Sequence, residues 1–198
     1  MVPFVGLTGG LGAGKSTALA ALERLGAAVL STDRVVHELY ETPELRDAVS
    51  AHFGRAVAPD GVVDRAVLAE RAFATAEDRA WLEGLLWPRV GIRMASWRAQ
   101  IERCSSRPRA AVIEVPLLFE AGMEGGFDAT IAILVDLQLM AQRAGARGHR
   151  ALEQRSARQL SPEAKAARAT YVVANDGTVD ELETKLSAVL DMLGRCRR

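Results

Sequence analysis

Short apolar segments bounded by turn-forming residues recur along the chain and predict buried strands. These segments are residues 2–7, 27–30, 110–115, 130–135 and 171–173. Apolar runs of this length, flanked by Gly, Pro, Asn or Asp, are typical of parallel strands covered on both faces. Helical patterns lie between them, and alternation of strand and helix is typical of the α/β class. The pattern therefore predicts an α/β fold with a parallel five-stranded sheet.

Two helical segments carry clear end signals. Residues 16–25 place leucines at helical spacing, and Gly26 lies where a left-handed C-terminal cap belongs. Near the other end of the chain, Thr178 and Glu181 have the spacing of a capping box. The apolar stripe that follows, which we expect Gly194 to close, consists of Val179, Leu182, Leu186, Val189, Leu190 and Leu193.

A long helical stretch, about residues 43–103, separates the second predicted strand from the third. Gly54, the Pro59-Asp60-Gly61 turn and Pro88 are expected to break it into pieces. Its aromatic residues are predicted to be core rather than a ligand cage. A helical insertion of this length is a reasonable binding region for an acceptor substrate beside an active-site cleft.

Composition limits the classes of protein to consider. The 198 residues suit one domain over 1–198, and the zero net charge gives no sign of a nucleic-acid or membrane partner. Cys104 and Cys196 lack metal-ligand spacing and are predicted to be free thiols. No apolar run reaches the roughly 20 residues of a membrane span, and the first run lacks a basic leader. The chain is predicted to be cytoplasmic, and a monomer or weak homo-oligomer.

The strongest chemical signal is a glycine-rich loop between the first strand and the first helix. It fits the pattern G-x-x-x-x-G-K-S/T, in which backbone N–H groups surround phosphate oxygens. Lys15 is expected to reach the β- and γ-phosphates of ATP, and the Ser16 hydroxyl to ligate Mg²⁺. The motif alone leaves a kinase, a GTPase and an ATPase open. The predicted nucleotide site comprises Gly9, Gly10, Leu11, Gly12, Ala13, Gly14, Lys15, Ser16 and Thr17.

Further segments, combined with this loop, resemble the dephospho-coenzyme A kinases. Residues 6–17 look like the opening of that family, and the VPLLFE sequence at residues 115–120 is similar to its third-strand signature. Other matching positions are Asp33, Asp60, Gly61, Asp64, Arg65, Leu68, Phe73, Arg143, Arg147, Gln159, Lys165, Asn175, Asp176 and Gly177. The resemblance implies a P-loop kinase fold with a helical substrate region and a mobile lid. It also implies ATP-dependent phosphorylation of the ribose 3′-hydroxyl of dephospho-coenzyme A.

The resemblance implies that Asp33 faces the acceptor hydroxyl, as a base or as an orienting acceptor. The same carboxylate could hold Mg²⁺ through water, and the residues alone leave a third role open. Asp33 directly precedes the helical pattern of residues 34–40, where aspartate is a good N-cap. The cap and the substrate contact are compatible with each other.

Several other residues receive substrate-binding roles from the same resemblance. Pro116 and Leu117 are expected to wall the acceptor pocket. Arg65 is expected to bind an acceptor phosphate or, alternatively, to be a solvated helical arginine. For Glu120, three alternatives stay open: a substrate contact, a partner for a lid arginine, and an ordinary surface carboxylate. Asn175 is expected in the adenine loop.

The segment 138–168 concentrates positive charge in a chain whose net charge is zero. It holds seven basic and two acidic residues. A solvated basic helix pair and an RNA-contact surface are alternatives, although no aromatic interleaving supports RNA. The favoured interpretation is a short basic lid that closes on the triphosphate and excludes water. Within it, Arg147 resembles the family arginine that reaches the ATP phosphates and is the predicted catalytic arginine.

Some positions depart from the family pattern, and these departures leave other functions open. Ser31 replaces an aspartate, Trp87 a histidine and Thr170 another aspartate, and the lid is a few residues short. A kinase for another small acceptor, such as a nucleotide, is one alternative. A second is a regulator that binds ATP without catalysis. A GTPase is disfavoured because no guanine-recognition motif is present. The predicted partners are thus ATP, Mg²⁺ and dephospho-coenzyme A.

Overall fold

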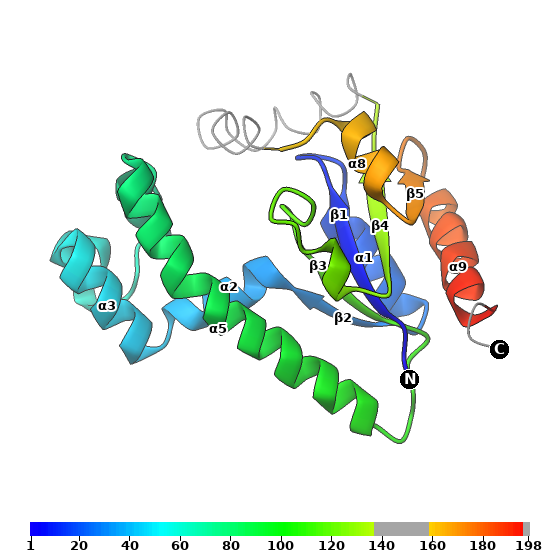
Figure 1. Cartoon of the computed structure of the whole chain (residues 1–198), viewed down its shortest axis with the longest axis horizontal. Coiled ribbons are helices and arrows are strands. Elements are labelled where there is room, and N and C mark those ends of the chain that lie inside the picture. The colour runs from blue at the N-terminus through cyan, green and yellow to red at the C-terminus, as the bar shows by residue number, and fades with distance from the viewer. Residues whose placement is uncertain (137–158, 196–198) are drawn as a thin grey trace. The chain divides into compact units, whose positions relative to one another are not determined.

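The computed structural model describes residues 1–136 and 159–195, and its centre is a parallel sheet (Figure 1). All strand pairings are parallel, in the order β2-β3-β1-β4-β5. This confirms the predicted five-stranded sheet, with strand ends shifted by one or two residues. The strands are β1 (Phe4–Gly9), β2 (Ala28–Ser31), β3 (Ala111–Glu114), β4 (Ala129–Leu134) and β5 (Tyr171–Ala174).

The central strand β1 is buried along its whole length, and its register places the ends of neighbouring strands together. Leu7 lies opposite Glu114 of β3 and Ile131 of β4. Parallel strands share one carboxyl edge, and ligands of open α/β sheets bind at that edge. The segments that leave β1, β3 and β5 at this edge therefore carry the candidate site.

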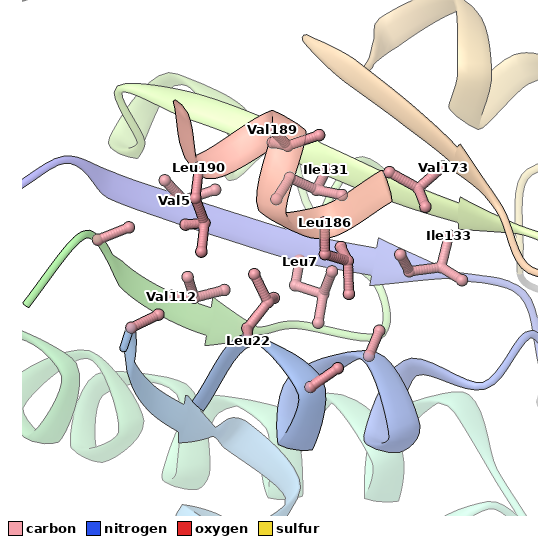
Figure 2. Packing of buried hydrophobic residues seen from close by; sticks show 14 of the residues in the cluster. Val5, Leu7, Leu22, Val112, Ile131, Ile133, Val173, Leu186, Val189 and Leu190 are labelled. Carbon is pink, nitrogen blue, oxygen red and sulfur yellow. The ribbon is translucent and has the colours of Figure 1, made fainter. Parts of the chain in front are cut away.

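One face of the sheet is covered by α1 (Lys15–Arg24) and α9 (Val179–Arg195) (Figures 1 and 2). Leu22 of α1 and Leu186 of α9 are both fully buried in this cluster, against Val5, Leu7 and other strand residues. Burying one such side chain contributes roughly 1.5–3 kcal/mol. Since α1 directly follows the glycine-rich loop, this packing fixes the C-terminal side of that loop.

The predicted helix ends are largely confirmed. Gly26 adopts φ 89° after α1, and the amides of residues 26 and 27 donate to the carbonyls of residues 23 and 22, as in a Schellman motif. Thr178 and Glu181 make both bonds of a capping box before α9. Two details were wrong. Val179 is exposed, since it precedes the part of α9 that packs on the sheet. The helix also continues through Gly194 to Arg195, because the buried Leu193 keeps its last turn on the core.

The opposite face of the sheet holds shorter elements: η3 (Glu124–Gly126) before β4, and α8 (Pro162–Arg168) beside β4 (Figure 1). The Phe127 ring stacks on Phe4 at 4.9 Å between centroids. Leu118 lies so close to Gly6 that a Cβ there would come within 2.4 Å of its Cδ1. Close packing therefore covers this face as well.

A second compact unit, Thr32–Ala99, is helical, whereas Met1–Ser31 and Gln100–Arg198 form the unit with the sheet. Gly54 and the 59–61 turn separate its elements as predicted. Pro88 does not break the helix, and that prediction was wrong. The elements of this stretch are α2 (Thr32–Tyr40), α3 (Pro43–Phe53), η1 (Arg55–Val57), η2 (Pro59–Gly61), α4 (Arg65–Ala72) and α5 (Ala76–Arg103), the last of which continues past residue 99.

Packing explains why α5 tolerates a proline, which removes one helical N–H group. Val90 and Met94 are buried on the turns after Pro88, and Arg89 pairs with Glu44 of α3. Its guanidinium also donates to the carbonyl of residue 85. The helix is thus held after the proline by the Arg89–Glu44 pair and before it by Leu82, which packs in the apolar cluster of the same unit.

The aromatic residues of this unit are predicted to be core, and Phe53 does lie in its apolar cluster, with Trp81 packed against it. The Trp81 ring stacks on His52 at 3.9 Å and meets Phe53 edge-on at 5.4 Å. Trp87 differs, because it is 40% exposed. Cys104 is an exposed free thiol, and Cys196 lies outside the described residues. Among the helices of the described residues, none combines the length and apolar character needed to cross a bilayer.

Candidate active site

The glycine-rich loop joins the end of β1 to the start of α1, as the motif predicts. Gly14 has φ 86°, a left-handed conformation that side chains rarely adopt. A Cβ at this position would also come within 2.2 Å of the Asn175 Nδ2 atom. The loop therefore needs glycine at position 14 for both backbone and steric reasons.

The start of α1 presents backbone donors suited to an anion. Its N-cap is glycine, which has no side chain to occupy the first N–H groups, and no acidic residue lies in its first turn. Open N–H groups and the helix dipole favour phosphate at such an end. Lys15 Nζ donates to the carbonyls of Gly9 and Gly10 at 3.1 and 3.0 Å, which keeps the ammonium group at the loop. Ser16 and Thr17 follow on the exposed side of the first turn.

Asn175 reaches the loop from the end of β5. Its backbone N–H donates to the Leu134 carbonyl at 2.8 Å, which extends the pairing of β4 with β5. Its side-chain Nδ2 donates to the Ala13 carbonyl, also at 2.8 Å, and the residue is only 6% exposed. The structure thus brings Asn175 to the phosphate loop itself, while an adenine contact stays a prediction.

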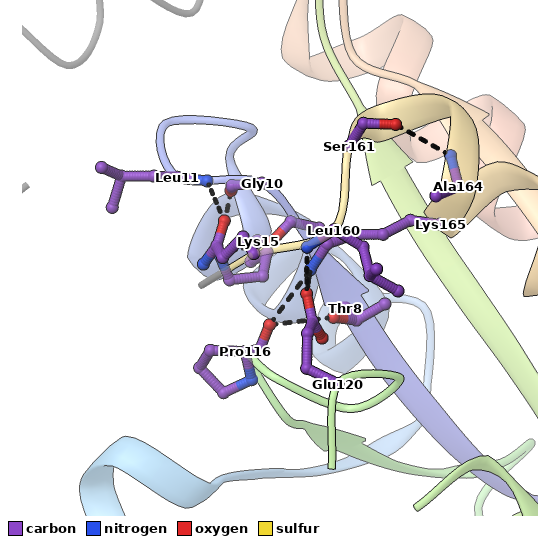
Figure 3. A network of polar contacts seen from close by, with 12 residues as sticks. Thr8, Gly10, Leu11, Lys15, Pro116, Glu120, Leu160, Ser161, Ala164 and Lys165 are labelled. Atoms are coloured by element: carbon purple, nitrogen blue, oxygen red, sulfur yellow. Dashed lines mark hydrogen bonds and ion pairs between the residues drawn. The ribbon is translucent and has the colours of Figure 1, made fainter. Parts of the chain in front are cut away.

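A polar network lies beside the loop, on the turn that follows β3 (Figure 3). The Pro116 carbonyl accepts from Thr8 Oγ1 at 3.2 Å and from Lys165 Nζ at 3.3 Å. Lys165 also pairs with Glu120 Oε1 at 2.9 Å, and the same oxygen accepts the Leu160 N–H at 2.8 Å. The VPLLFE turn is therefore tied to β1 and to the segment that leads into α8.

The electrostatics of Glu120 follow from this environment. Burial acts to raise the pKa of Glu120, but the hydrogen bonds from Lys165 and Leu160 and the Lys165 charge hold that pKa below its usual range. The side chain of Glu120 is only 13% exposed. The alternative of an ordinary surface carboxylate is therefore wrong. In the described part of the chain its basic partner is a lysine, while a substrate contact stays a prediction.

Lys165 is a functional candidate that matched the family pattern in the sequence but received no role of its own there. Its side chain has no exposed surface, although it lies in a seven-residue helix rich in alanine. Charge counting placed it, with Arg168, in the basic lid segment. Both have acidic partners instead, Glu120 for Lys165 and Glu124 for Arg168. A lone lysine between alanines gives no periodic signal of burial, so only the match to the family motif marked this position.

The Thr170 departure has a structural explanation. The Thr130 N–H donates to Thr170 Oγ1 and the Thr170 N–H donates to Thr130 Oγ1, both at 3.0 Å. The reciprocal pair holds the start of β4 beside the start of β5. An aspartate carboxylate at position 170 could accept the same bond from residue 130. Ser31, the other replaced aspartate, ends β2 opposite Glu114.

Asp33 and Arg65 belong to the helical unit. α2 begins at Thr32, so Asp33 lies inside its first turn, and the alternative role of Asp33 as the N-cap was wrong. Arg65 is the first residue of α4, after the N-cap Asp64. Burial raises the pKa of Tyr40 to about 12, and the nearby Arg65 charge partly offsets that effect. Tyr40 follows Asp33 by seven residues, two helical turns, so one side of α2 carries both.

The described residues contain no group of three or more His, Cys, Asp or Glu side chains that could hold a metal ion. Mg²⁺ commonly takes one or two protein ligands and completes its shell with water and substrate phosphates. A single hydroxyl such as that of Ser16, beside a phosphate loop, fits this donor set. Arg147, the predicted catalytic arginine, lies outside the described residues, as do Arg143, Arg150 and Arg155.

Known structures with similar folds include kinases of small molecules. TT1252 from Thermus thermophilus superposes with a TM-score of 0.74 at 31% identity, covering 98% of this chain and 99% of that chain. Dephospho-CoA kinase from Campylobacter jejuni gives a TM-score of 0.63 at 21% identity, covering 96% of this chain and 97% of that chain. Shikimate kinase from Aquifex aeolicus gives a TM-score of 0.53 at 15% identity, covering 97% of both chains. The latter two similarities establish the P-loop kinase fold.

Sequence comparisons specify the family. The model of the family described as dephospho-CoA kinase matches residues 3–181. Dephospho-CoA kinase of Deinococcus radiodurans is 39% identical over 193 residues, covering 96% of this chain and 91% of the relative. Dephospho-CoA kinase of Moorella thermoacetica is 35% identical over 197 residues, covering 97% of this chain and 92% of the relative. This protein, with its phosphate loop and VPLLFE turn joined at one sheet edge, belongs to the dephospho-CoA kinase family.

Proposed function

We propose that this protein transfers the γ-phosphoryl group of ATP to the ribose 3′-hydroxyl of dephospho-coenzyme A, which gives coenzyme A and ADP. The observation that carries the proposal is the family match over residues 3–181, in a chain whose phosphate loop is intact. The bond between the β-γ bridging oxygen and the γ-phosphorus breaks, and a bond from the 3′-oxygen forms. The hydroxyl proton leaves to a base or to water.

The nucleotide side of the reaction rests on the phosphate loop. Backbone N–H groups at the start of α1 would bind the phosphates, while the Leu11 N–H donates to Gln159 and the Ala13 N–H to the Gly10 carbonyl. Lys15 would neutralise charge on the β- and γ-phosphates. Ser16 would hold Mg²⁺, which supplies charge neutralisation between those phosphates when bound. Phosphoryl transfer needs this positioning and electrostatic stabilisation far more than covalent help.

The acceptor side is assigned to the turn after β3 and to the helical unit. Asp33 would orient or deprotonate the 3′-hydroxyl, and Arg65 would bind a phosphate of the acceptor. Pro116 and Leu117 would contact its apolar parts. The region 43–103 would bind the acceptor, and Arg147 would stabilise the charge on the transferred group. Localisation in the cytoplasm and a monomeric or weakly oligomeric state stay predictions.

A regulator without catalysis is the alternative from another class, and the departures at Ser31 and Thr170 suggested it. The reciprocal Thr130–Thr170 bonds give Thr170 a role in joining strands, so this departure supports no loss of catalysis. A kinase for another acceptor is opposed by the family match.

An acceptor screen tests the proposal. The protein is incubated with ATP, Mg²⁺ and dephospho-coenzyme A, AMP or shikimate in parallel, and the products are analysed by mass spectrometry. We expect one added phosphate on dephospho-coenzyme A, with stoichiometric ADP, and little on the other two. Transfer to AMP or shikimate at an equal or higher rate would refute the proposed acceptor. ATP binding without transfer to any of the three would favour the regulator.

A further inference from the structure

Lys165 is an unusual residue for the interior, because its ammonium group is completely buried. The charge is compensated by Glu120 Oε1 at 2.9 Å and by the Pro116 carbonyl at 3.3 Å. Replacing a buried ion pair by apolar residues of similar volume is often neutral or stabilising. Stability alone is therefore a weak reason for this pair, and its contacts point to what else it does.

One branch of contacts leads from the pair into the phosphate loop. Glu120 Oε1 accepts the Leu160 N–H at 2.8 Å (Figure 3). The preceding residue, Gln159, places its side-chain Oε1 on the Leu11 N–H at 3.1 Å. Leu11 is the third residue of the loop motif. A fixed peptide at Leu160 thus limits where the Gln159 amide can lie, and that amide limits the orientation of the Leu11 peptide.

A second branch reaches the same loop from the other side. Lys165 and Thr8 share the Pro116 carbonyl as acceptor. Thr8 is fully buried and directly precedes Gly9, where the loop begins. The pair is therefore connected both to the residue before the loop and to a peptide inside it.

We propose that the Lys165–Glu120 pair is a positioning device for the phosphate loop, and that Gln159 is the residue through which it orients the Leu11 peptide for nucleotide binding. This inference rests on the proposed function, since it assumes that the loop binds ATP. Gln159, Glu120 and Lys165 are positioning residues, because they act through the loop. Loss of the Gln159 amide should weaken nucleotide binding and leave the KM for dephospho-coenzyme A nearly unchanged.

The first test removes the amide without disturbing a buried charge. Gln159→Met keeps the length of the side chain and loses the acceptor for the Leu11 N–H. The measurement is the Kd of a non-hydrolysable ATP analogue with Mg²⁺, by calorimetry, together with Tm. We expect the Kd to rise about 2- to 10-fold, the worth of one hydrogen bond, with Tm nearly unchanged. Gln100→Met, on the exposed side of α5, is the matched control and should equal wild type.

The second test separates positioning from stability. The double variant Glu120→Leu/Lys165→Met removes both charges at similar volume, so it should fold with a Tm close to wild type. A positioning role predicts that it nevertheless binds the analogue about 2- to 10-fold more weakly. Adding Gln159→Met to it should cause little further loss, because residues of one network are not additive.

Unchanged Kd values in the Gln159→Met variant would overturn the inference, whether or not the double variant folds. A folded double variant with wild-type affinity would overturn the role of the pair. Because the binding measurement uses no acceptor, these results are independent of the proposed reaction. Wild-type protein that binds the analogue but makes no coenzyme A would refute the proposed function and leave the positioning inference standing.

Discussion

The two sides of the phosphate loop are built in different ways. The side that would face the nucleotide consists of backbone N–H groups, Lys15 and the exposed hydroxyl groups of the first turn of α1. The supporting side consists of side chains from distant segments, with Asn175 on the Ala13 carbonyl and Gln159 on the Leu11 N–H. Ser16 and Thr17 are exposed and Lys15 is held by carbonyls of the loop itself, whereas the supporting groups bind partners far away in the chain.

This difference predicts whether a substitution near the loop changes activity or stability. Groups that contact substrate should be replaceable with little loss of folding free energy, because few protein contacts depend on them. Removing one member of the buried Lys165–Glu120 pair, which lies on the supporting side, should reduce stability because the other charge is left buried. The predictions below use this contrast between activity and stability.

The largest expected effect is on catalysis, from Asp33→Asn. If Asp33 orients or deprotonates the acceptor hydroxyl, kcat should fall about 10²- to 10⁴-fold, while the Kd for ATP changes little. Asp33 lies in the first turn of α2, where a negative charge is worth only about 0.3–1 kcal/mol to the helix. Steady-state kinetics and thermal unfolding measure both effects. A variant that loses stability but keeps its specific activity would show that Asp33 serves the helix alone.

Lys165→Met should produce the largest loss of stability. It leaves the Glu120 carboxylate buried without its cation, and breaking such a pair costs about 3–5 kcal/mol of unfolding free energy. Urea unfolding checks this value. Lys185→Met is the matched control, because Lys185 is exposed and its ammonium group donates to the Ala174 carbonyl. Equal stability of the two variants would contradict the account of the buried pair.

Lys15→Ala should mainly reduce catalysis, whereas Lys165→Met should mainly reduce the free energy of unfolding. Loss of one electrostatic contact to the transferred phosphate costs roughly 3–4 kcal/mol of transition-state stabilisation, by analogy with oxyanion donors. We expect a fall in kcat/KM of two to three orders of magnitude with Tm almost unchanged. Near-normal turnover in a folded variant would rule out the phosphate role of Lys15.

A smaller effect is expected at Thr170, away from the loop. Thr170→Val removes the acceptor of the Thr130 N–H and should cost about 1–2 kcal/mol of unfolding free energy. Thr170→Asp keeps an acceptor and should remain close to wild type. The comparison is made by urea unfolding, with kcat measured alongside. A fall in kcat for both variants at unchanged stability would give Thr170 a catalytic role instead.

The smallest effect concerns pH. The pKa of Glu120 is lower in the folded chain than in the unfolded one, so its contribution to stability is complete above the unfolded pKa of about 4.3. That contribution is lost as pH falls below this value and through the folded pKa. The Glu120→Leu/Lys165→Met variant should therefore lose less unfolding free energy than wild type as the pH falls by a few units from about 5. Urea unfolding at a series of pH values measures this, and identical slopes of unfolding free energy against pH would contradict the assignment.

The ligand-facing side could be predicted from sequence because its signals are local. The motif around Gly14 and Lys15 is contiguous, and so are the end signals at Gly26 and Thr178. The five strands of the parallel sheet also followed from short apolar runs, since parallel strands need both faces covered. The errors at Pro88 and Gly194 have one cause: tertiary packing of a helix face outweighed a local breaker.

The supporting side could not be predicted, because its partners are far apart in the chain. Lys165 and Glu120 are 45 positions apart by their residue numbers, and Gln159 and Leu11 are separated by 148. Lysine, glutamate and glutamine are ordinarily surface residues. Their burial appears only when the fold brings the turn after β3 next to the start of α8.

The central claim is the transfer of one phosphoryl group to a specific hydroxyl, and the position of the new phosphate tests it most directly. Wild-type protein is incubated with ATP, Mg²⁺ and dephospho-coenzyme A, and the product is purified and examined by phosphorus NMR with proton correlation. The account predicts a monophosphate ester on the ribose 3′-oxygen, one ADP per product, and almost no product with Lys15→Ala. A phosphate at any other position, or equal product from Lys15→Ala, would contradict it.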